Sequence, residues 1–351
     1  MSRIWPVIAV FWLFMMSACN PDASVNVPTK KTNEAIIITT TSFPYSTQIA
    51  TETRILPTHT RTATISSTRT LEPAANPSST TPAMSFSSND TTKPFLPIFN
   101  FPISENYNQT IDSSYRYGTT QNGARLPHDG VEFYNEYGTP VIAALNGTVV
   151  FAGSDEKELW GRFKDYYGNM VIIEHSPVPA GPNFYSLYAH LSKINVRTGE
   201  VVSSGHKIGE VGFSGGAIGS HLHFEVRVGQ PLLANTSNPE LYLPLGTDAS
   251  GVSMGILAGR ILDASGLIVE DAGINIQAMR NDQVDPDQIP TYLTSYTKGM
   301  PLNTGVGENF VISNLEEGEY RLTVYISGSL QERFVRVFAD QITFITIQPK
   351  N

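Results

Sequence analysis

A histidine pair separated by one residue, His221 and His223, lies in a stretch that alternates between polar and apolar side chains as far as Val228. Such alternation is typical of a β-strand. Successive strand side chains point to opposite faces, so both histidines project from one face, and Leu222 and Phe224 project from the other. The stretch therefore predicts a strand that can hold a metal ligand and a catalytic base close together. By itself it is also compatible with one surface histidine and one hydrogen-bonded core histidine.

Two further segments carry histidines next to chemically useful neighbours. His128 and Glu132 are four residues apart, around a glycine at position 130 that permits a sharp bend. His190 lies at the end of the apolar, strand-like run 184–191. Four of the 7 histidines of the chain thus fall in three segments. We expect the other three to be solvated or hydrogen-bonded locally: His59, His175 and His206.

These three segments resemble, in the same order, the motifs of the lysostaphin-type (LytM-like) zinc endopeptidases, which cut peptidoglycan cross-links. The segments are His128-x-x-x-Glu132, Tyr188-Ala189-His190-Leu191 and His221-Leu222-His223. The resemblance covers roughly residues 110–230. The chain departs from the family at Glu132, which stands where the family has aspartate, and Asp129 is at the wrong offset to replace it. Glutamate is also an accepted zinc ligand.

The resemblance implies roles for five side chains. His128, Glu132 and His223 would bind Zn²⁺ in a three-ligand catalytic site that leaves one position open for water. His190 and His221 would flank that water and stabilise the oxyanion, and one of them would take the proton of the water and later protonate the leaving amine. Which histidine does which stays open. The implied substrate is the peptide part of peptidoglycan, its stems or cross-bridges.

Composition narrows the class of protein further. The net charge of the 351-residue chain is −9, and no basic region is concentrated enough to indicate nucleic-acid binding. The single cysteine, Cys19, excludes an intramolecular disulfide and a cysteine-based zinc site. We expect a monomer without a nucleic-acid partner.

The N-terminus resembles a bacterial lipoprotein signal. Arg3 gives a short positive region, and the apolar stretch 4–16 is too short for a comfortable membrane span. Met16-Ser17-Ala18-Cys19 then resembles a lipobox that ends at the only cysteine. We therefore expect residues 1–19 to be a signal peptide, and the mature protein to be held at the membrane, facing the cell wall, by a lipid on Cys19. The alternative is a plain secretory signal with an incidental cysteine.

The rest of the chain is expected to form an all-β protein. Residues 20–94 are rich in Ser, Thr and Pro, and no glycine occurs before Gly118, which predicts a disordered, fairly extended stalk. Residues 95–245 are expected to form an antiparallel β catalytic domain, in which short strands are separated by Gly, Asn and Pro turns. Within it, residues 154–166 are expected to form a hairpin loop or one helical turn.

A linker, 246–254, and a small β-sandwich, 255–351, complete the expected organisation. Strands are expected at 257–262, 273–278, 309–312, 318–326, 332–337 and 342–347. Asn314 to Leu322 and Gly259 to Gly266 resemble a turn and the opening strand of carboxypeptidase-regulatory-like, transthyretin-type sandwiches. The segment contains no histidine or cysteine, so we expect a spacer or binding module that is separable from catalysis.

Three functional hypotheses follow. The first is a surface-anchored zinc metalloendopeptidase that remodels the cell wall by cutting peptidoglycan cross-links. The second is a catalytically impaired LytM-like module that binds the wall or activates another hydrolase; Glu132 favours it, whereas the presence of all four motif histidines argues against it. The third is an adhesion protein whose sandwich carries the function. Metal content together with peptidoglycan digestion distinguishes them.

Overall fold

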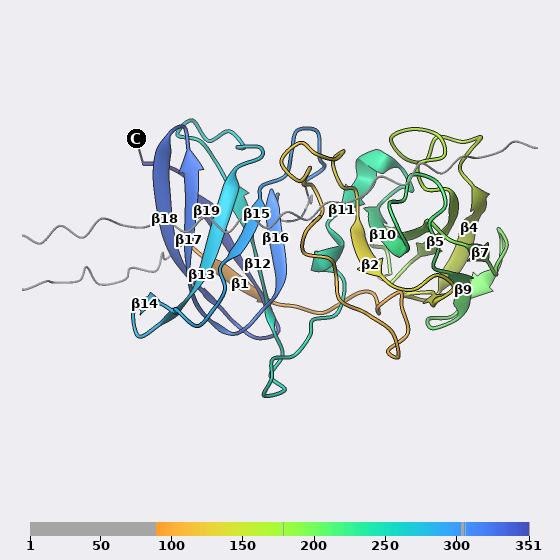
Figure 1. The fold of residues 1–351 in the computed structure, drawn as a ribbon, viewed down its shortest axis with the longest axis horizontal. Helices are drawn as coiled ribbons and strands as arrows, with labels where there is room; N and C mark the ends of the chain where they lie inside the picture. The colour runs from red at the N-terminus through yellow and green to blue at the C-terminus, as the bar shows by residue number, and fades with distance from the viewer. Residues whose placement is uncertain (1–88, 178, 303–304, 306, 351) are drawn as a thin grey trace, which may run out of the picture. The chain divides into compact units, whose positions relative to one another are not determined.

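The computed structural model describes residues 89–177, 179–302, 305 and 307–350, and these belong to one compact unit that spans residues 78–351 (Figure 1). The described residues form β-strands and two short 3₁₀ helices, η1 (Leu233–Asn235) and η2 (Pro239–Leu241), with no α-helix among them. The expected all-β fold class is confirmed. No helix within the described ranges is long and apolar enough to cross a membrane. The expected signal peptide, Cys19 and nearly all of the expected stalk lie outside the described residues.

A seven-stranded antiparallel sheet is the framework of the segment with the histidine motifs. Its order is β11-β10-β6-β5-β4-β8, and β2 pairs with β10 as well. The strands are β2 (Val131–Tyr134), β4 (Gly147–Ser154), β5 (Asn169–His175), β6 (Phe184–Ala189), β8 (Val201–Val202), β10 (His221–Val228) and β11 (Thr236–Ser237). A second, three-stranded sheet has the order β3-β9-β7 and consists of β3 (Pro140–Ile142), β9 (Lys207–Glu210) and β7 (Lys193–Ile194).

Strand β10 brings the three motifs together. Its alternation places Leu222 and Phe224 in the hydrophobic core, as the sequence predicted. On one side of β10, His223 lies opposite Glu132 of β2. On the other side, His223 lies opposite Ala189, the last residue of β6. The register therefore sets residues that are far apart in the sequence around a single point of the sheet.

The C-terminal segment consists of two sheets with a hydrophobic core of their own. One has the order β1-β19-β12-β16, with β1 (Thr91–Pro94), β19 (Gln341–Ile347), β12 (Gly255–Ile261) and β16 (Phe310–Leu315). The other has the order β14-β13-β17-β18, with β15 also on β13: β13 (Gly273–Arg280), β14 (Gln283–Val284), β15 (Thr291–Thr294), β17 (Gly318–Ile326) and β18 (Ser329–Val337). This is the expected small β-sandwich; the likeness to transthyretin-type domains stays a prediction.

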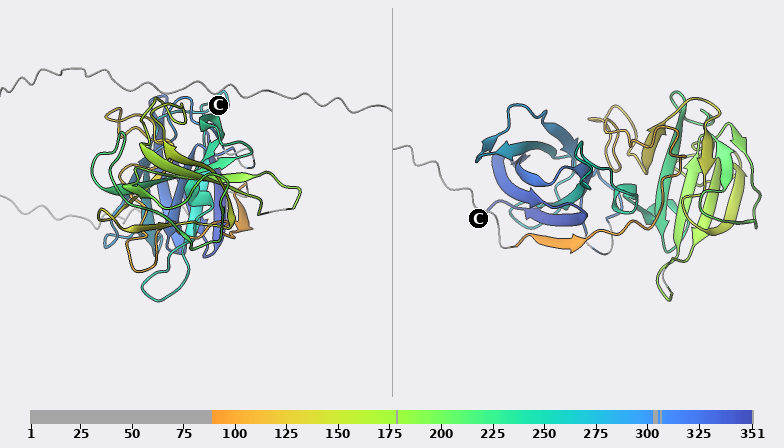
Figure 2. Two further views of the ribbon diagram at one scale, coloured as in Figure 1. Left: turned by 90° about the vertical axis from the view of Figure 1, so that its right-hand side faces the viewer. Right: turned by 90° about the horizontal axis from the view of Figure 1, so that it is seen from below.

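Strand β1 comes from residues that the sequence analysis placed at the end of the stalk. Thr91–Pro94 pair antiparallel with β19, and Figure 2 shows this orange strand along the blue strands of the sandwich. Four exposed residues of the type TTKP give no alternation from which a strand could be predicted. The pairing adds an N-terminal edge strand to a sheet built from the C-terminus.

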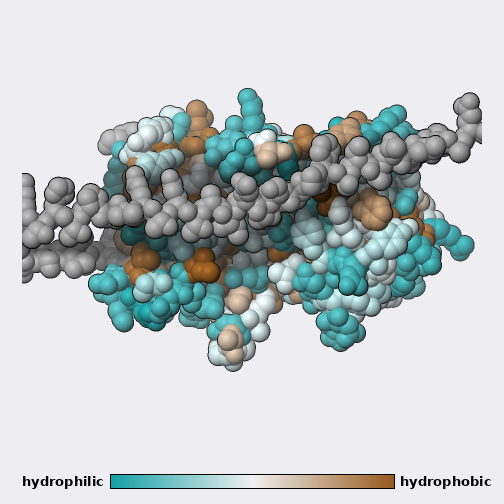
Figure 3. All heavy atoms as spheres, viewed as in Figure 1, coloured by the Kyte–Doolittle hydropathy of each residue, from teal (hydrophilic) through white to brown (hydrophobic). Residues whose placement is uncertain are grey.

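One hydrophobic cluster runs through the boundary expected at residues 246–254. It joins Val131 and Phe224 of the large sheet with Ile256 and Val311 of the sandwich. The residues between form a turn closed by the bridge from Thr247 to Ser253. Figure 3 shows that the visible face of the described residues is mostly hydrophilic or intermediate, with scattered hydrophobic residues. The sandwich therefore shares a hydrophobic core with the segment before it, and its separability from catalysis stays a prediction.

Candidate metal centre

Three side chains from two strands and the turn before β2 converge on one point. The Nε2 of His128 lies 3.2 Å from the Nδ1 of His223 and 3.8 Å from Oε1 of Glu132. One ligand atom from each of the three residues lies within 4.8 Å of the others, and all three residues are buried. The structure therefore brings together the three side chains that the resemblance assigned to the metal.

Each of the two histidines is held by the ring nitrogen that faces away from this point. The Nδ1 of His128 donates to the carbonyl oxygen of Tyr115 at 2.6 Å, and the Nε2 of His223 donates to Oε1 of Glu225 at 3.1 Å. A carbonyl or carboxylate oxygen only accepts, so these contacts leave a lone pair on His128 Nε2 and on His223 Nδ1. Two lone pairs that face each other at 3.2 Å need a proton or a cation between them.

The donor set fits a zinc ion. Two ligand atoms about 2.0–2.1 Å from one zinc ion, at the tetrahedral angle, are about 3.3 Å apart, close to the observed spacing of the two imidazole nitrogens. Oε2 of Glu132 and Nε2 of His221 are buried and have no hydrogen-bond partner among the described residues. Buried polar atoms without partners are rare, and an ion bound at this point would give Oε2 of Glu132 a partner. Two imidazoles and one carboxylate are also a known catalytic zinc set.

His190 and His221 lie beside the three donor groups. Their ring centroids are 4.9 Å apart, and the ring of His190 is 5.7 Å from that of His223. The Nδ1 of His190 donates to the carbonyl of Ser214 at 2.9 Å, and the Nδ1 of His221 donates to that of Gly219 at 3.1 Å. Both therefore keep Nε2 unprotonated. His221 Nε2 is 3.6 Å from Oε1 of Glu132, so it faces the same point.

The backbone of His190 has a conformation that few side chains adopt. Its φ is +61°, in the left-handed region that non-glycine residues rarely occupy. Its N–H donates to the carbonyl of Tyr167 at 2.9 Å, which helps to hold the turn at the end of β6. Such strained residues cluster at functional sites. Sequence periodicity could not reveal this feature, because the strand-like run ends here.

Burial keeps His128, His190 and His221 neutral by lowering the pKa of each ring. Burial lowers the pKa of His128 well below 6.5, and the neighbouring His223 lowers it further. Burial, followed by His223 and His221, likewise lowers the pKa of His190 well below 6.5. The pKa of His221 is also lowered by burial, although Glu132 partly opposes this. Neutral imidazoles at neutral pH can bind a metal or accept a proton.

A second layer of buried side chains, absent from the sequence analysis, supports His223. Arg227 donates from Nε to Oε2 of Glu225 at 2.8 Å, and Tyr167 donates its hydroxyl to the other oxygen of this carboxylate. Burial would raise the pKa of Glu225, but the charge of Arg227 and these hydrogen bonds outweigh it and lower the pKa. The alternation along β10 could have indicated this support, because it places Glu225 and Arg227 on the same face as the two histidines.

Asp129 does not join the donor group. Its carboxylate accepts two hydrogen bonds from Arg162, at 2.7 and 2.8 Å. Because both oxygens of Asp129 are engaged by Arg162, this carboxylate pairs with a cation of the protein and not with the proposed metal. Arg162 belongs to residues 155–166, which follow β4 and form turns and bends without a helical turn. Trp160 of this segment packs on Phe151, with ring centroids 4.9 Å apart.

The five side chains open into a pocket of about 320 Å³. Its rim carries the exposed apolar side chains of Leu126, Phe163 and Ile218. Of the described residues that line it, Arg125 alone is a lysine or arginine, and its guanidinium lies 4.8 Å over the ring of Tyr115. A substrate would thus meet an apolar rim, one cation and buried imidazoles.

Of the histidines outside the motifs, the two that the structure describes do not line this pocket. His175 is buried and hydrogen-bonds through Nδ1 to the carbonyl of Asn146 and through Nε2 to Ser186, as a structural core histidine does. His206 is half exposed, 4.0 Å from a carboxylate oxygen of Glu200. His59 lies outside the described residues.

Residues 126–236 match the model of peptidase family M23, so the chain contains a domain of this family. The matched range includes all five side chains at the pocket.

Similar proteins include the peptidoglycan DD-endopeptidase ShyA of Vibrio cholerae, which is 36% identical over 137 residues, 36% of this chain and 29% of that protein. The DD-carboxypeptidase/endopeptidase Mpg of Neisseria meningitidis is 33% identical over 156 residues, 44% of this chain and 32% of that protein. The lipoprotein NlpD/LppB homolog of Pseudomonas aeruginosa is 37% identical over 116 residues, 33% of each chain. The chain spans about a third or less of the length of these relatives.

One solved structure with similarity to the chain is a zinc-containing peptidase from Vibrio cholerae, with a TM-score of 0.32, 30% identity and coverage of 40% of this chain and 39% of that chain. Another is the catalytic domain of lysostaphin from Staphylococcus simulans, with a TM-score of 0.31, 31% identity and coverage of 38% of this chain and 90% of that chain.

Proposed function

We propose that this chain is a zinc metalloendopeptidase that hydrolyses peptide bonds in peptidoglycan cross-links. The observation that carries the proposal is the convergence of His128, Glu132 and His223 on one point, with ring tautomers that leave donor atoms facing it. The family M23 domain supports the reaction class. The activities for which the two endopeptidase relatives are named support peptidoglycan as the substrate.

The metal ligands are Nε2 of His128, Nδ1 of His223 and the carboxylate of Glu132. A zinc ion bound there supplies Lewis-acid activation of water and of the scissile carbonyl. Tyr115 and Glu225 fix the tautomer and the ring orientation of the two histidines by accepting their outer N–H groups. Glutamate in place of aspartate keeps the charge and the donor atom of this ligand.

His190 and His221 perform the proton transfers. Each has its Nδ1 proton engaged by a backbone carbonyl, so its Nε2 can accept the proton of the attacking water. The protonated ring can then donate to the oxyanion or to the leaving amine. The low pKa that burial gives both rings keeps them unprotonated at neutral pH, so that each Nε2 is free to accept a proton, and makes each ring a strong acid once protonated.

The second candidate is a LytM-like module that binds the wall or activates another hydrolase without cutting peptide bonds. The replacement of the family's aspartate by Glu132 favours it. The two candidates differ in turnover. A protein that binds sacculi but releases no peptide fragments would be the module.

The peptidase and the non-cleaving module can be distinguished with purified residues 78–351, which belong to one compact unit. We expect about one zinc ion per chain and the release of soluble fragments from peptidoglycan, with new amino termini at the cleaved bonds. The His223→Ala variant, which lacks one ligand, serves as the matched inactive control. Zinc-loaded protein that never releases more than this control would reject the peptidase.

Membrane attachment through a lipid on Cys19, in an extracytoplasmic location, completes the proposal. It is supported by the lipobox-like sequence that ends at the only cysteine. Replacing Cys19 by alanine should move the protein to the soluble fraction or block its processing. Unchanged membrane association of a variant without lipid would contradict this part alone.

A further inference from the structure

The segment Tyr115–Thr119 holds His128 at four points. The carbonyl of Tyr115 accepts from His128 Nδ1 at 2.6 Å, and the two rings stack with centroids 4.0 Å apart and planes 3° apart. The backbone N–H of Gly118 donates to the carbonyl of His128 at 2.8 Å, and the N–H of His128 donates to that of Thr119 at 3.0 Å. The position of the His128 ring therefore depends on this segment.

The other side of the segment rests on the C-terminal sandwich. The N–H of Thr297 donates to the carbonyl of Gly118 at 2.8 Å. The ring of Tyr296 meets that of Tyr117 edge-on, with centroids 5.2 Å apart. Gly118 has φ +78°, and a Cβ there would lie 2.4 Å from Cδ1 of Tyr296. The contact is thus so close that it requires glycine in the segment.

Tyr296 is itself fixed within the protein. It is 3% exposed, and it follows β15. Its N–H donates to the carbonyl of Asn309 at 2.6 Å, and its hydroxyl oxygen accepts from Asn238 at 3.0 Å. Because Tyr296 is held at its backbone and at its hydroxyl group, the position of the sandwich determines the position of the residues that pack on the Tyr296 ring.

A second attachment joins the segment to the sandwich through charge. Arg116 forms two hydrogen bonds to the buried carboxylate of Glu240, at 3.0 and 2.8 Å. The same carboxylate accepts from the backbone N–H of Ser313 in β16 at 2.9 Å. The carboxylate therefore bridges the segment and the sandwich.

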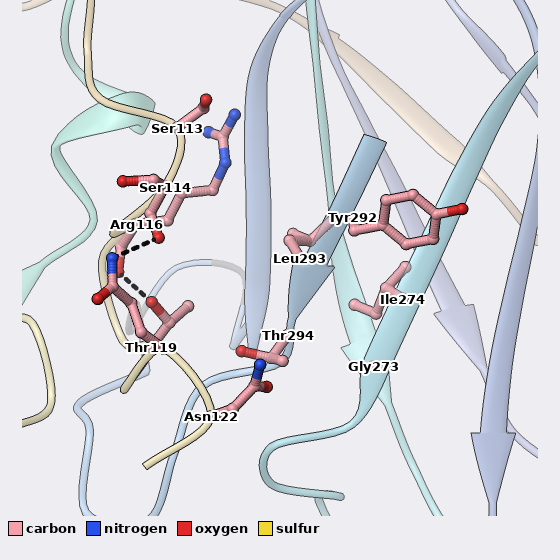
Figure 4. Close-up of a pocket in the computed structure, with 11 residues that line it drawn as sticks. Ser113, Ser114, Arg116, Thr119, Asn122, Gly273, Ile274, Tyr292, Leu293 and Thr294 are labelled. Atoms are coloured by element: carbon pink, nitrogen blue, oxygen red, sulfur yellow. Dashed lines mark hydrogen bonds between the residues drawn. The ribbon is translucent and has the colours of Figure 1, made fainter. Parts of the chain in front are cut away.

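Between these attachments the packing is open. A cavity of about 270 Å³ lies here. In Figure 4 the segment is on one side of the cavity and strands β13 and β15 are on the other. The labelled residues around it include Ser113, Arg116, Thr119, Ile274, Tyr292 and Leu293. The support is therefore concentrated at Tyr296 and Thr297 and at the Glu240 bridge, so single substitutions can test it.

We propose that the C-terminal sandwich is a positioning element of the metal centre, and that Tyr296 is the residue through which it holds the 115–119 segment against His128. The inference rests on the proposed metal centre and adds a role for a domain that contributes no ligand. It replaces the expectation that catalysis is separable from the sandwich. The chain of contacts runs from Tyr296 to Gly118 and Tyr117, then to Tyr115 and the His128 ring.

The test measures metal affinity in the full chain, by chelator competition for Zn²⁺ and by the visible absorption spectrum of bound Co²⁺. Tyr296→Ala removes the ring that supports the segment, and we expect zinc binding to weaken by roughly ten-fold or more, as for other outer-shell losses. The Co²⁺ spectrum should change as well, because the geometry of the ligand at His128 is less well fixed. Tyr296→Phe keeps the ring and should bind both metals nearly as the parent does.

Leu322→Ala is the matched control. Leu322 is fully buried in the core of the sandwich, in a cluster that does not include Tyr296. The variant should lose thermal stability and keep the metal affinity of the parent. If Tyr296→Ala does not fold, Tyr296→Leu, which keeps apolar bulk without the planar ring, takes its place.

Three outcomes would overturn the inference, and they differ in whether the proposed function is also rejected. A folded Tyr296→Ala or Tyr296→Leu protein that binds Zn²⁺ and Co²⁺ as the parent does would overturn the inference and leave the proposed function standing. A parent chain that binds neither metal would overturn the metal centre and the inference with it. A Leu322→Ala protein that loses metal affinity as strongly as the Tyr296 variants would also overturn the specific role of Tyr296, because general destabilisation would then suffice.

Discussion

Glu225 accepts a hydrogen bond of 3.1 Å from Nε2 of His223, on the side of the imidazole that faces away from the proposed metal. The same carboxylate pairs with Arg227 at 2.8 Å, and the side chains of both residues of this pair are 0% exposed. A carboxylate behind a ligating histidine fixes the tautomer of the ring and strengthens it as a donor. The strand that supplies the ligand thus also supplies its support, two residues further along the same face.

Glu225→Gln should weaken zinc binding by about 10- to 100-fold, the usual cost of losing an outer-shell partner. The variant also leaves Arg227 as a buried cation without its counter-charge, which should cost about 3–5 kcal/mol of stability. Chelator competition and thermal unfolding measure the two effects separately. Glu210→Gln, which removes a surface carboxylate paired with Lys207, is the control and should change neither strongly. Unaltered zinc affinity in a folded Glu225→Gln protein would speak against this support.

Glu132 is expected to act as a ligand even though the family has aspartate at this position. Glu132→Gln keeps the size of the side chain and removes its charge, so zinc occupancy should fall strongly. Glu132→Asp restores the family residue and should retain metal. Zinc content measured after dialysis against a weak chelator compares the two variants. Full occupancy and full cleavage by Glu132→Gln would show that the carboxylate is not a ligand.

The sequence predicted those parts of the site that local alternation controls. The strand from His221 to Val228 and the position of His190 after a strand follow from side-chain periodicity, and the structure contains both. The resemblance to the family identified which side chains would lie together at the metal centre. The seven-stranded order and the pairing of His223 opposite Glu132 are set by packing between distant segments, which periodicity does not encode.

The residues that position the metal ligands could not be predicted from the sequence for a different reason. Tyr115 acts on His128 through its backbone carbonyl and through ring stacking, so its residue type does not indicate its role. The contact of Tyr296 with Gly118 spans 178 positions, and a tyrosine after a strand normally indicates core packing. Strand β1 depends on pairing with β19 and has no pattern of its own.

The buried His175 should make folding sensitive to acid. Burial lowers its pKa from 6.5 to about 4, so the folded chain favours the neutral ring more than the unfolded chain does. The unfolded chain therefore binds more protons in this range, and stability rises with pH. The contribution is complete above pH 6.5 and is lost as the pH falls from 6.5 towards 4, in total roughly 3 kcal/mol.

His175→Gln should flatten this dependence, because glutamine keeps hydrogen-bonding groups and does not titrate. Denaturant unfolding of the metal-free protein at several values of pH between 4 and 7 measures the slope. The difference between parent and variant isolates His175 from His128, His190 and His221, whose lowered pKa values affect both proteins alike. An identical slope in the two proteins would mean that His175 does not contribute.

The two histidines of β10 are expected to have different roles, although they share one face of one strand. Losing His223 removes one ligand of three, and the two that remain hold zinc poorly, so His223→Ala should lose both zinc and cleavage. Losing His221 or His190 removes a proton-transfer group and leaves the three donors in place. His221→Ala and His190→Ala should therefore keep zinc and lose turnover by a factor of about 10²–10⁴, with little change in substrate binding. Zinc content by atomic absorption, measured beside cleavage for the three variants, makes the comparison. A site emptied by His221→Ala but still loaded in His223→Ala would reverse the two roles.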